Sequence, residues 1–218
     1  MKTVTTLLAL ALAPTLLAGC ATIEAVTNIE EPAYKVLKQD GDFELREYNP
    51  MIIAEVTVRG SLDEANGRGF RLIADYIFGN NLSKASSSNE KIAMTAPVTM
   101  TRDGEKIAMT APVTMDSAAP DTWRMHFVMP SRYTMATLPT PKNPAVKLRE
   151  VKGQKVAALR FSGFSGEEKI AEQTALLNAW MSKSNLSASG VSQLARYNMP
   201  ITPPPFRRNE ILIPVTAP

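Results

Sequence analysis

The segment Glu90-Lys-Ile-Ala-Met-Thr-Ala-Pro-Val-Thr-Met100 recurs without change at residues 105–115, a tandem copy offset by 15 residues. Larger apolar residues alternate with small or polar ones in each copy, and this period of two predicts a β-strand. Asp103-Gly104 lies between the copies and is a favoured two-residue hairpin turn. We therefore predict an antiparallel hairpin with a methionine-rich inward face, in which Pro97 and Pro112 mark a bulge or an edge. The inward-facing residues would be Ile92, Met94, Ala96, Val98 and Met100, and in the second copy Ile107, Met109, Ala111, Val113 and Met115.

The same order of elements occurs on both sides of a proline-rich connection at residues 131–145. Each half has strand-like runs, then a helix that begins with a capping-box sequence, and then further strand-like runs. The capping boxes are Ser61 with Glu64 and Ser165 with Glu168, and the first helix should extend to about Phe78. The strand-like runs are residues 34–37, 43–48, 51–59 and 123–129 in the first half, and 146–151, 155–161, 193–197 and 210–215 in the second.

This repeat predicts an α+β fold in one domain, residues 33–215, with halves at about 33–130 and 146–215. Two such halves pack as a pseudo-twofold, antiparallel distorted β-barrel or sheet flanked by two helices.

The composition excludes several classes of function. The 218 residues include one cysteine and one histidine, which excludes a disulfide framework and any Cys/His metal cluster within one chain. The formal net charge is +3 and the basic residues are scattered, so we expect no nucleic-acid partner. The fragment Gly163-Phe-Ser-Gly-Glu167 lacks the last glycine of a nucleophile elbow, and no His–Asp pair can be proposed. We therefore expect that the protein is not an enzyme.

The N-terminus has the pattern of a secretory signal, with Lys2 followed by an uncharged apolar run as far as Ala18. The run ends in Leu17-Ala-Gly-Cys20, which resembles the lipobox of bacterial lipoproteins. We predict a signal peptide at residues 1–19, lipidation of Cys20 and a tether at residues 20–32; an ordinary secretory signal with a chance cysteine is the alternative. Ala21 rather than aspartate follows the cysteine, and by resemblance to such lipoproteins this favours the periplasmic side of the outer membrane over the inner membrane. No other stretch of 18 apolar residues is present to span a bilayer.

Three segments together resemble the SOUL haem-binding protein family. They are Lys91-Ile-Ala-Met-Thr-Ala-Pro-Val98 with its copy, the helix at residues 63–78, and Pro205-Phe-Arg-Arg-Asn-Glu-Ile-Leu-Ile-Pro214. The resemblance covers roughly residues 33–215. It implies a pseudo-twofold distorted β-barrel flanked by two helices, which binds haem or another tetrapyrrole in a shallow apolar groove beside the first helix. In that family, basic side chains near the groove hold the haem propionates.

The resemblance also implies where haem would lie in this chain. Where animal members have basic residues on the first helix, this chain has Gly67 and Asp75, and the nearest substitutes are Arg68 and Arg71. The only imidazole that could bind the haem iron belongs to His126. The residues predicted to bind haem are Arg68, Phe70, Arg71, Ile73, Ile77, Met94 and Met109, with His126 as an axial candidate.

Each of these residues also has a structural interpretation. The apolar face of the helix could simply pack on the sheet, and the methionines could fill the core. His126 shares a face with Arg124 and Val128, opposite the apolar set of its strand, so it could be a histidine that faces outward. Arg207 or Arg208 could bind a propionate, or Glu210 could pair with an arginine in a structural network, which is the interpretation we favour.

The sequence leaves three functions open. The first is a membrane-anchored lipoprotein that binds haem, a related tetrapyrrole or another apolar small molecule without a covalent bond. The second is a structural or interaction lipoprotein that has kept the fold without haem binding. The third is a module that senses small molecules, which a pocket containing a buried glutamate would favour.

Overall fold

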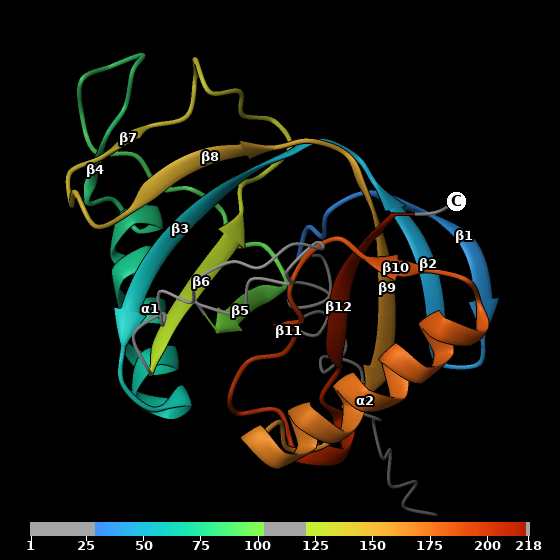
Figure 1. The fold of residues 1–218 in the computed structure, drawn as a ribbon. Helices are drawn as coiled ribbons and strands as arrows, with labels where there is room; N and C mark the ends of the chain where they lie inside the picture. Colours follow the sequence, from blue (N-terminus) through green and yellow to red (C-terminus); the bar gives the residue numbers. More distant parts are fainter. Residues whose placement is uncertain (1–28, 103–120, 217–218) are drawn as a thin grey trace, which may run out of the picture.

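The computed structural model describes residues 29–102 and 121–216, which form an open antiparallel sheet curled into a half-barrel and flanked by two helices (Figure 1). The helices are α1 (Leu62–Ile77) and α2 (Glu167–Lys183). The strands are β1 (Tyr34–Asp40), β2 (Phe43–Tyr48), β3 (Met51–Arg59), β4 (Asn81–Leu82), β5 (Val98–Arg102), β6 (Thr122–Val128), β7 (Thr140–Pro141), β8 (Lys147–Val151), β9 (Gln154–Phe161), β10 (Ser187–Ala188), β11 (Gln193–Arg196) and β12 (Asn209–Thr216). The predicted α+β class is confirmed.

The strand order along the sheet is β1-β2-β9-β12-β11-β5-β6-β3-β8, with β10 paired to β12 and with β4 and β7 in a separate ribbon. From β2 to β8 this order reads the same in both directions when the elements of the two halves are matched in chain order. In that match, the elements β2, β3, α1, β5 and β6 correspond to β8, β9, α2, β11 and β12. The two halves meet where Val98–Met100 of β5 pair with residues 194–196 of β11. This arrangement confirms the pseudo-twofold repeat that the sequence predicts.

The two faces of the sheet have different roles. The helices cover the outer face, where α1 packs on β3 and β6 and α2 packs on β9 and β12. The predicted alternation in β3 is confirmed, because Val56 and Val58 are buried in the α1 cluster while Thr57 is exposed. On the other side, Leu177 of α2 is buried with Ile211 of β12. Strands from both halves curl around the remaining face, which we call the inner face, so it is free of helices.

The two helix starts differ, although the sequence predicts a capping box at each. At α1 the box forms: the Glu64 backbone N–H donates to the Ser61 hydroxyl, and the Ser61 N–H donates to the Glu64 carboxylate. At α2 the prediction is wrong, because Gly166 is the N-cap and makes no side-chain cap hydrogen bond. The Ser165 hydroxyl instead accepts a hydrogen bond from the Arg196 guanidinium at 3.0 Å. A tertiary contact with β11 has therefore replaced the local one.

The repeated segment is only partly a strand. β5 begins at Val98, so the predicted strand is wrong before that residue. Ile92, Ala96 and Met100 are buried as predicted, but Met94 has 38% of its surface exposed, so its predicted inward position is wrong. Pro97 has no N–H to donate to a sheet. At Val98–Met100, β5 is paired with β11 on one side and with β6 on the other. The second copy, with Met109, lies outside the described residues.

The packed domain begins earlier than the predicted boundary at residue 33. The Ala96 N–H donates to the Glu30 carbonyl at 3.0 Å, and the Ser131 N–H donates to the Glu30 carboxylate at 2.7 Å. Glu30, which the sequence assigns to the tether, is thus bonded to the segments just before β5 and just after β6. None of the helices in the described parts of the chain is long and apolar enough to cross a membrane.

Gly67 and Gly69 of α1 give a matched test of how closely this helix approaches the sheet. A Cβ at Gly67 would meet only the Arg71 guanidinium at 3.5 Å, so Gly67→Ala should raise the free energy of unfolding by about 1 kcal/mol through helix propensity. A Cβ at Gly69 would lie 3.0 Å from the Met125 sulfur and 3.3 Å from its Cβ. Gly69→Ala should therefore lower the free energy of unfolding by roughly 1–3 kcal/mol, because the added methyl group overpacks this contact. Urea unfolding of the chain without residues 1–20 measures both variants. If the free energy of unfolding changed in the same direction in both, the close packing of Gly69 on Met125 would be contradicted.

Candidate functional site: cavities on the inner face

Two adjoining cavities lie in the half-barrel, one at an edge of the sheet and one on its inner face. The larger one, which we call the cleft, has a volume of about 620 Å³. The smaller one, which we call the inner cavity, has a volume of about 210 Å³. They share the side chains of Pro32, Met51, Val128 and Val151 in their linings, so one ligand could extend from the first into the second.

The position of the cleft follows from the topology. β6, β3 and β8 are antiparallel neighbours, so the end of β6, the start of β3 and the end of β8 meet at one edge of the sheet. The residues at these three points are Val128, Met51 and Val151, and all three are apolar. The edge is therefore lined with apolar side chains, while Lys152 and Glu150 are also among the lining residues.

The N-terminal segment at residues 30–33 forms another wall of the cleft. Its backbone is held at both ends, since Ala96 donates to the Glu30 carbonyl and the Asn49 N–H donates to the Ala33 carbonyl at 3.0 Å. The cleft thus depends on a segment that is distant in sequence from most of its other residues.

His126 lies on the inner face of β6, between Glu55 of β3 and Thr99 of β5, and lines the inner cavity. It points away from the apolar set of its strand as predicted, but the expected outward-facing position is wrong because the curl of the sheet partly buries it. Burial, reinforced by the charges of Arg149 and Arg124, lowers the pKa of His126 to about 4. The imidazole is therefore uncharged at neutral pH, which is the form that binds metals.

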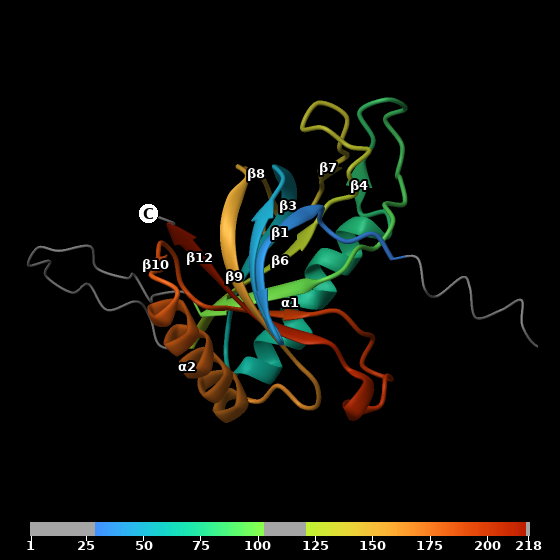
Figure 2. The ribbon, with the colours of Figure 1, turned by 90° about the vertical axis from the view of Figure 1, so that its right-hand side faces the viewer.

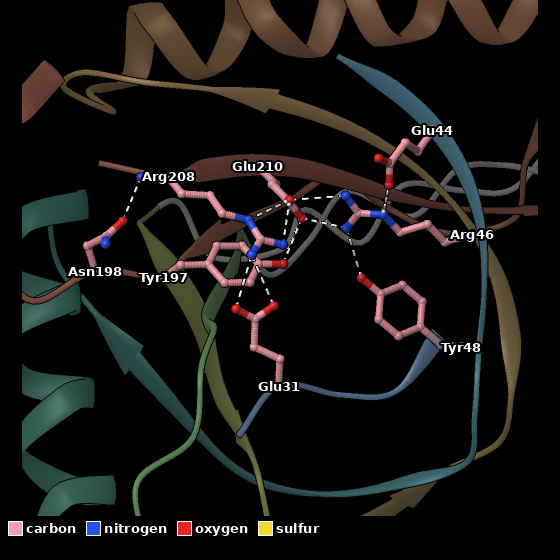
Figure 3. Close-up of polar contacts among 8 residues, drawn as sticks. All are labelled: Glu31, Glu44, Arg46, Tyr48, Tyr197, Asn198, Arg208 and Glu210. Atoms are coloured by element: carbon pink, nitrogen blue, oxygen red, sulfur yellow. Dashed lines mark hydrogen bonds and ion pairs between the residues drawn. The ribbon is translucent and has the colours of Figure 1, made fainter. Parts of the chain in front are cut away.

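A buried polar cluster lies deeper on the inner face, around Glu210 of β12 (Figure 3). The Arg46 guanidinium of β2 donates to both Glu210 carboxylate oxygens, at 2.6 and 3.0 Å. The Arg208 guanidinium donates to Glu210 at 3.0 Å, and the Tyr197 hydroxyl donates at 2.6 Å. Burial alone would raise the pKa of Glu210, but the hydrogen bonds and charge of Arg46 outweigh it, and this pKa is lowered.

The same cluster fixes the N-terminal segment. The Arg208 guanidinium donates to both carboxylate oxygens of Glu31 at 3.0 Å, and it lies 3.7 Å from the ring centre of Tyr197 (Figure 3). Arg46 also donates to Glu44 at 2.6 Å. The network predicted around Glu210 is confirmed for Arg208. It omits Arg207, whose guanidinium donates to the carbonyls of Pro200 and Thr202.

The residues that the resemblance placed on the first helix lie elsewhere than the cavities. Ile73 and Ile77 are fully buried between α1 and the sheet, and Phe70 is partly buried against Phe127 with ring centres 5.7 Å apart. The Arg68 guanidinium donates to the Arg59 carbonyl at 3.1 Å, while Arg71 is exposed.

None of the predicted residues on the helix, nor Met94, lines the cleft or the inner cavity. Met109 and Cys20 lie outside the described residues. His126 alone of the predicted set lines a cavity on the inner face.

Sequence reasoning missed the residues of the cleft. The signal that could have found them is the second set of alternating positions in each strand, such as Met51 and Ile53 in β3 and Val128 in β6. These residues are apolar although they lie opposite the helix-covered face.

Residues 29–214 match the family described as SOUL heme-binding protein, which is most of the chain. The chain belongs to the SOUL haem-binding protein family. Among curated proteins, no match is found.

Solved structures share the fold of this SOUL domain. The C-terminal domain of EcmrR has a TM-score of 0.57 at 9% identity, and the alignment covers 85% of this chain and 99% of that one. A hydrolase from Listeria innocua has a TM-score of 0.52 at 12% identity, covering 83% and 94% of the two chains. An uncharacterised conserved protein from Listeria innocua has a TM-score of 0.54 at 12% identity, covering 80% and 92%. At such low identities the likeness concerns the fold alone.

The cavities of the SOUL domain can be tested for their fit to haem. Their shared apolar residues suit the faces of a macrocycle, and the uncharged imidazole of His126 suits an iron. Arg149, which is paired with Glu55 at 3.1 Å, and Lys152 lie on the linings and suit carboxylate groups. Within residues 29–102 and 121–216, no three His, Cys, Asp or Glu side chains gather into a separate metal site. These residues fit haem better than those of α1, whose isoleucines are enclosed in the core.

Removing the charge of Glu210 tests the buried cluster. Glu210→Gln leaves the buried guanidinium of Arg46 and the partly buried guanidinium of Arg208 without their shared carboxylate, and should lower the free energy of unfolding by roughly 3–5 kcal/mol. The control is Glu167→Gln, which breaks the exposed pair with Arg102 and should cost less than about 1 kcal/mol. Urea unfolding measures both, and equal losses would contradict the importance of this cluster.

Proposed function

We propose that this protein binds haem or a related tetrapyrrole non-covalently in the cleft and the inner cavity. The observation that carries the proposal is the pair of adjoining cavities, about 620 and 210 Å³, with His126 on the lining of the smaller one. Ligand pockets typically measure about 300–1,000 Å³ and combine apolar walls with a few polar groups. Membership of the SOUL haem-binding family supports a tetrapyrrole as the ligand.

In this proposal the chain holds the ligand by burial and orientation. Met51, Val128 and Val151 would cover the faces of the ring, and removal of apolar surface from water would supply most of the affinity. Arg149 and Lys152 would pair with the carboxylates. His126 would offer an imidazole nitrogen to the iron, and a haem group held in this way supplies redox and gas-binding chemistry.

The groove beside α1 is the alternative location for the ligand. There Phe70 would contact the ring, and Arg68 or Arg71 would meet the carboxylates. The cleft is favoured because it already has the volume and the apolar lining, whereas Arg68 is bonded to the Arg59 carbonyl.

We further propose that the protein is a binding protein rather than an enzyme, since the sequence lacks a nucleophile elbow and a His–Asp pair. A role as a module that senses small molecules receives less support. Its expected mark is a buried glutamate, and Glu210 is buried, but Arg46 and Arg208 already neutralise its charge.

We also propose that the protein is a lipoprotein, anchored through Cys20 on the periplasmic side of the outer membrane. The proposal rests on the lipobox-like sequence Leu17-Ala-Gly-Cys20 and on Ala21 after it. A single acyl chain binds membranes only marginally, so a stable anchor needs the two or more chains that such lipoproteins carry.

Titration with haem tests the proposed ligand and its location. In the chain without residues 1–20, micromolar haem should give a shifted Soret band and quench the tryptophan fluorescence. Ala33→Trp places a large ring in the cleft and should weaken binding by at least about tenfold, or about 1.4 kcal/mol. Ala93→Trp, at an exposed alanine outside both cavities, is the control and should bind as the parent does.

Three results of this titration separate the alternatives. Unchanged binding by the double variant Arg68→Glu/Arg71→Glu is expected if the ligand lies in the cleft. Loss of binding in that variant, with Ala33→Trp unaffected, would place haem beside α1 instead. No Soret shift in the parent chain would favour a structural or interaction lipoprotein.

The low pKa of His126 predicts how haem ligation responds to acid. Its folded pKa of about 4 lies below the ordinary value of about 6.5, so the imidazole stays unprotonated between these values and is protonated only below about 4. The histidine-ligated absorbance spectrum should therefore persist at pH 5 and be lost near pH 4. His126→Ala should remove that spectrum at every pH. A spectrum lost near pH 6.5, or kept in His126→Ala, contradicts ligation by this residue.

Metabolic labelling tests the lipid anchor. In a Gram-negative host, the full chain should incorporate radioactive palmitate and fractionate with outer membranes. Cys20→Ser should abolish the label, because that sulfur is the predicted attachment site. A labelled Cys20→Ser variant, or an unlabelled parent chain, would show that the motif is not used.

A further inference from the structure

Four large apolar side chains are exposed together on two loops at one end of the half-barrel. Phe164 lies between β9 and α2, and Met199, Ile201 and Phe206 lie between β11 and β12. Their exposed fractions are 70% for Phe164, 50% for Met199, 85% for Ile201 and 76% for Phe206. Such a concentration of exposed apolar side chains is unusual on the surface of a soluble protein and indicates an interaction site.

The two loops are fastened to each other, so these side chains form one surface, which we call the loop patch. The Gly163 N–H donates to the Pro204 carbonyl at 2.9 Å, and the Asn209 amide donates to the Gly163 carbonyl at 3.0 Å. The Arg207 guanidinium lies 5.5 Å from the ring centre of Phe164 and donates to the carbonyls of Pro200 and Thr202. The patch is therefore held in place by the fold.

A basic hollow adjoins the loop patch. It has a volume of about 520 Å³ and is lined by Arg160, Arg207, Arg208 and Phe206, with Asp42 as the acidic residue of its lining. The Arg208 guanidinium already forms ion pairs with Glu31 and Glu210. Among the described residues, the Arg160 side chain is exposed and makes no hydrogen bond or ion pair, so its charge is available to an anion.

The N-terminal segment lies on the same side of the molecule. Glu31 is bonded to Arg208, which lines the basic hollow beside Arg207. Figure 2 shows the start of the described chain, in blue, and the turn at Pro204–Phe206, in dark orange, on the same side, with α2 on the other. Eight residues lie between Cys20 and Ile29, so the nine steps from one to the other span at most about 32 Å when fully extended.

We propose that the loop patch and the basic hollow dock on the surface of an anionic phospholipid bilayer. Phe164, Ile201 and Phe206 would enter the boundary between headgroups and acyl chains, where aromatic and aliphatic side chains are favoured. Arg160 and Arg207 would bind the phosphates of the headgroups. The charge of the hollow and the short reach from Cys20 favour a membrane over a protein partner. Docking would fix the orientation of a protein that a lipid anchor alone leaves free to rotate.

Vesicle flotation tests this proposal on the chain without residues 1–20, which keeps all described elements and lacks the lipid. The chain should float with vesicles of phosphatidylethanolamine and phosphatidylglycerol, and not with vesicles of phosphatidylcholine. Binding should weaken at high salt, since salt screens exposed charges. Ile201→Ser/Phe206→Ser should reduce binding at least tenfold. Arg160→Gln should reduce it about fivefold, which corresponds to about 1 kcal/mol per basic residue near an anionic surface.

Matched controls make the same kinds of change, apolar to serine and arginine to glutamine, elsewhere on the surface. Leu176→Ser replaces an exposed leucine of α2 and Arg59→Gln an exposed arginine at the end of β3, and both should bind vesicles as the parent does. Thermal unfolding and haem titration of every variant should match the parent, which separates this proposal from the proposed function. Absence of flotation by the parent, or equal losses in the controls and the patch variants, overturns it.

Discussion

The structure depends on one buried carboxylate, that of Glu210. A charge in the interior is tolerated only when it is paired and hydrogen-bonded, so Glu210 of β12 requires Arg46 from β2 and Arg208, the residue just before β12. β9 lies between β2 and β12, and the small buried Ala158 leaves room on the inner face for the Arg46 side chain to cross. Arg208 in turn binds Glu31 and so holds the wall of the cleft. One carboxylate therefore links β2 to β12 and, through Arg208, holds the N-terminal wall of the cleft.

The pseudo-twofold repeat explains why a ligand site can exist on the inner face. Each half places its helix on the outer face, and the two helices bury the larger apolar clusters there. The inner face is then enclosed by strands alone. Its apolar residues at the edge, such as Met51 and Val128, line a cavity, and its polar residues pair with each other. One face of the strands thus packs against the helices and stabilises the fold, and the opposite face lines the proposed ligand site.

Much of the fold could be predicted because it is local. The alternation in Met51–Arg59 and the capping box of Ser61 with Glu64 depend on neighbours in sequence, and both occur as predicted. The failures arise from distant contacts. Ser165 binds Arg196 instead of capping α2, and the surroundings of His126 depend on how far the sheet curls. The cleft joins a strand edge to the N-terminal segment, and no spacing within one strand reveals such a meeting.

The most direct measurement is a crystal structure of the chain without residues 1–20 grown with haem. The account predicts density for the ring against Met51, Val128 and Val151, with its iron facing His126. Density beside Phe70 on the surface of α1, with the cleft left open, would contradict it.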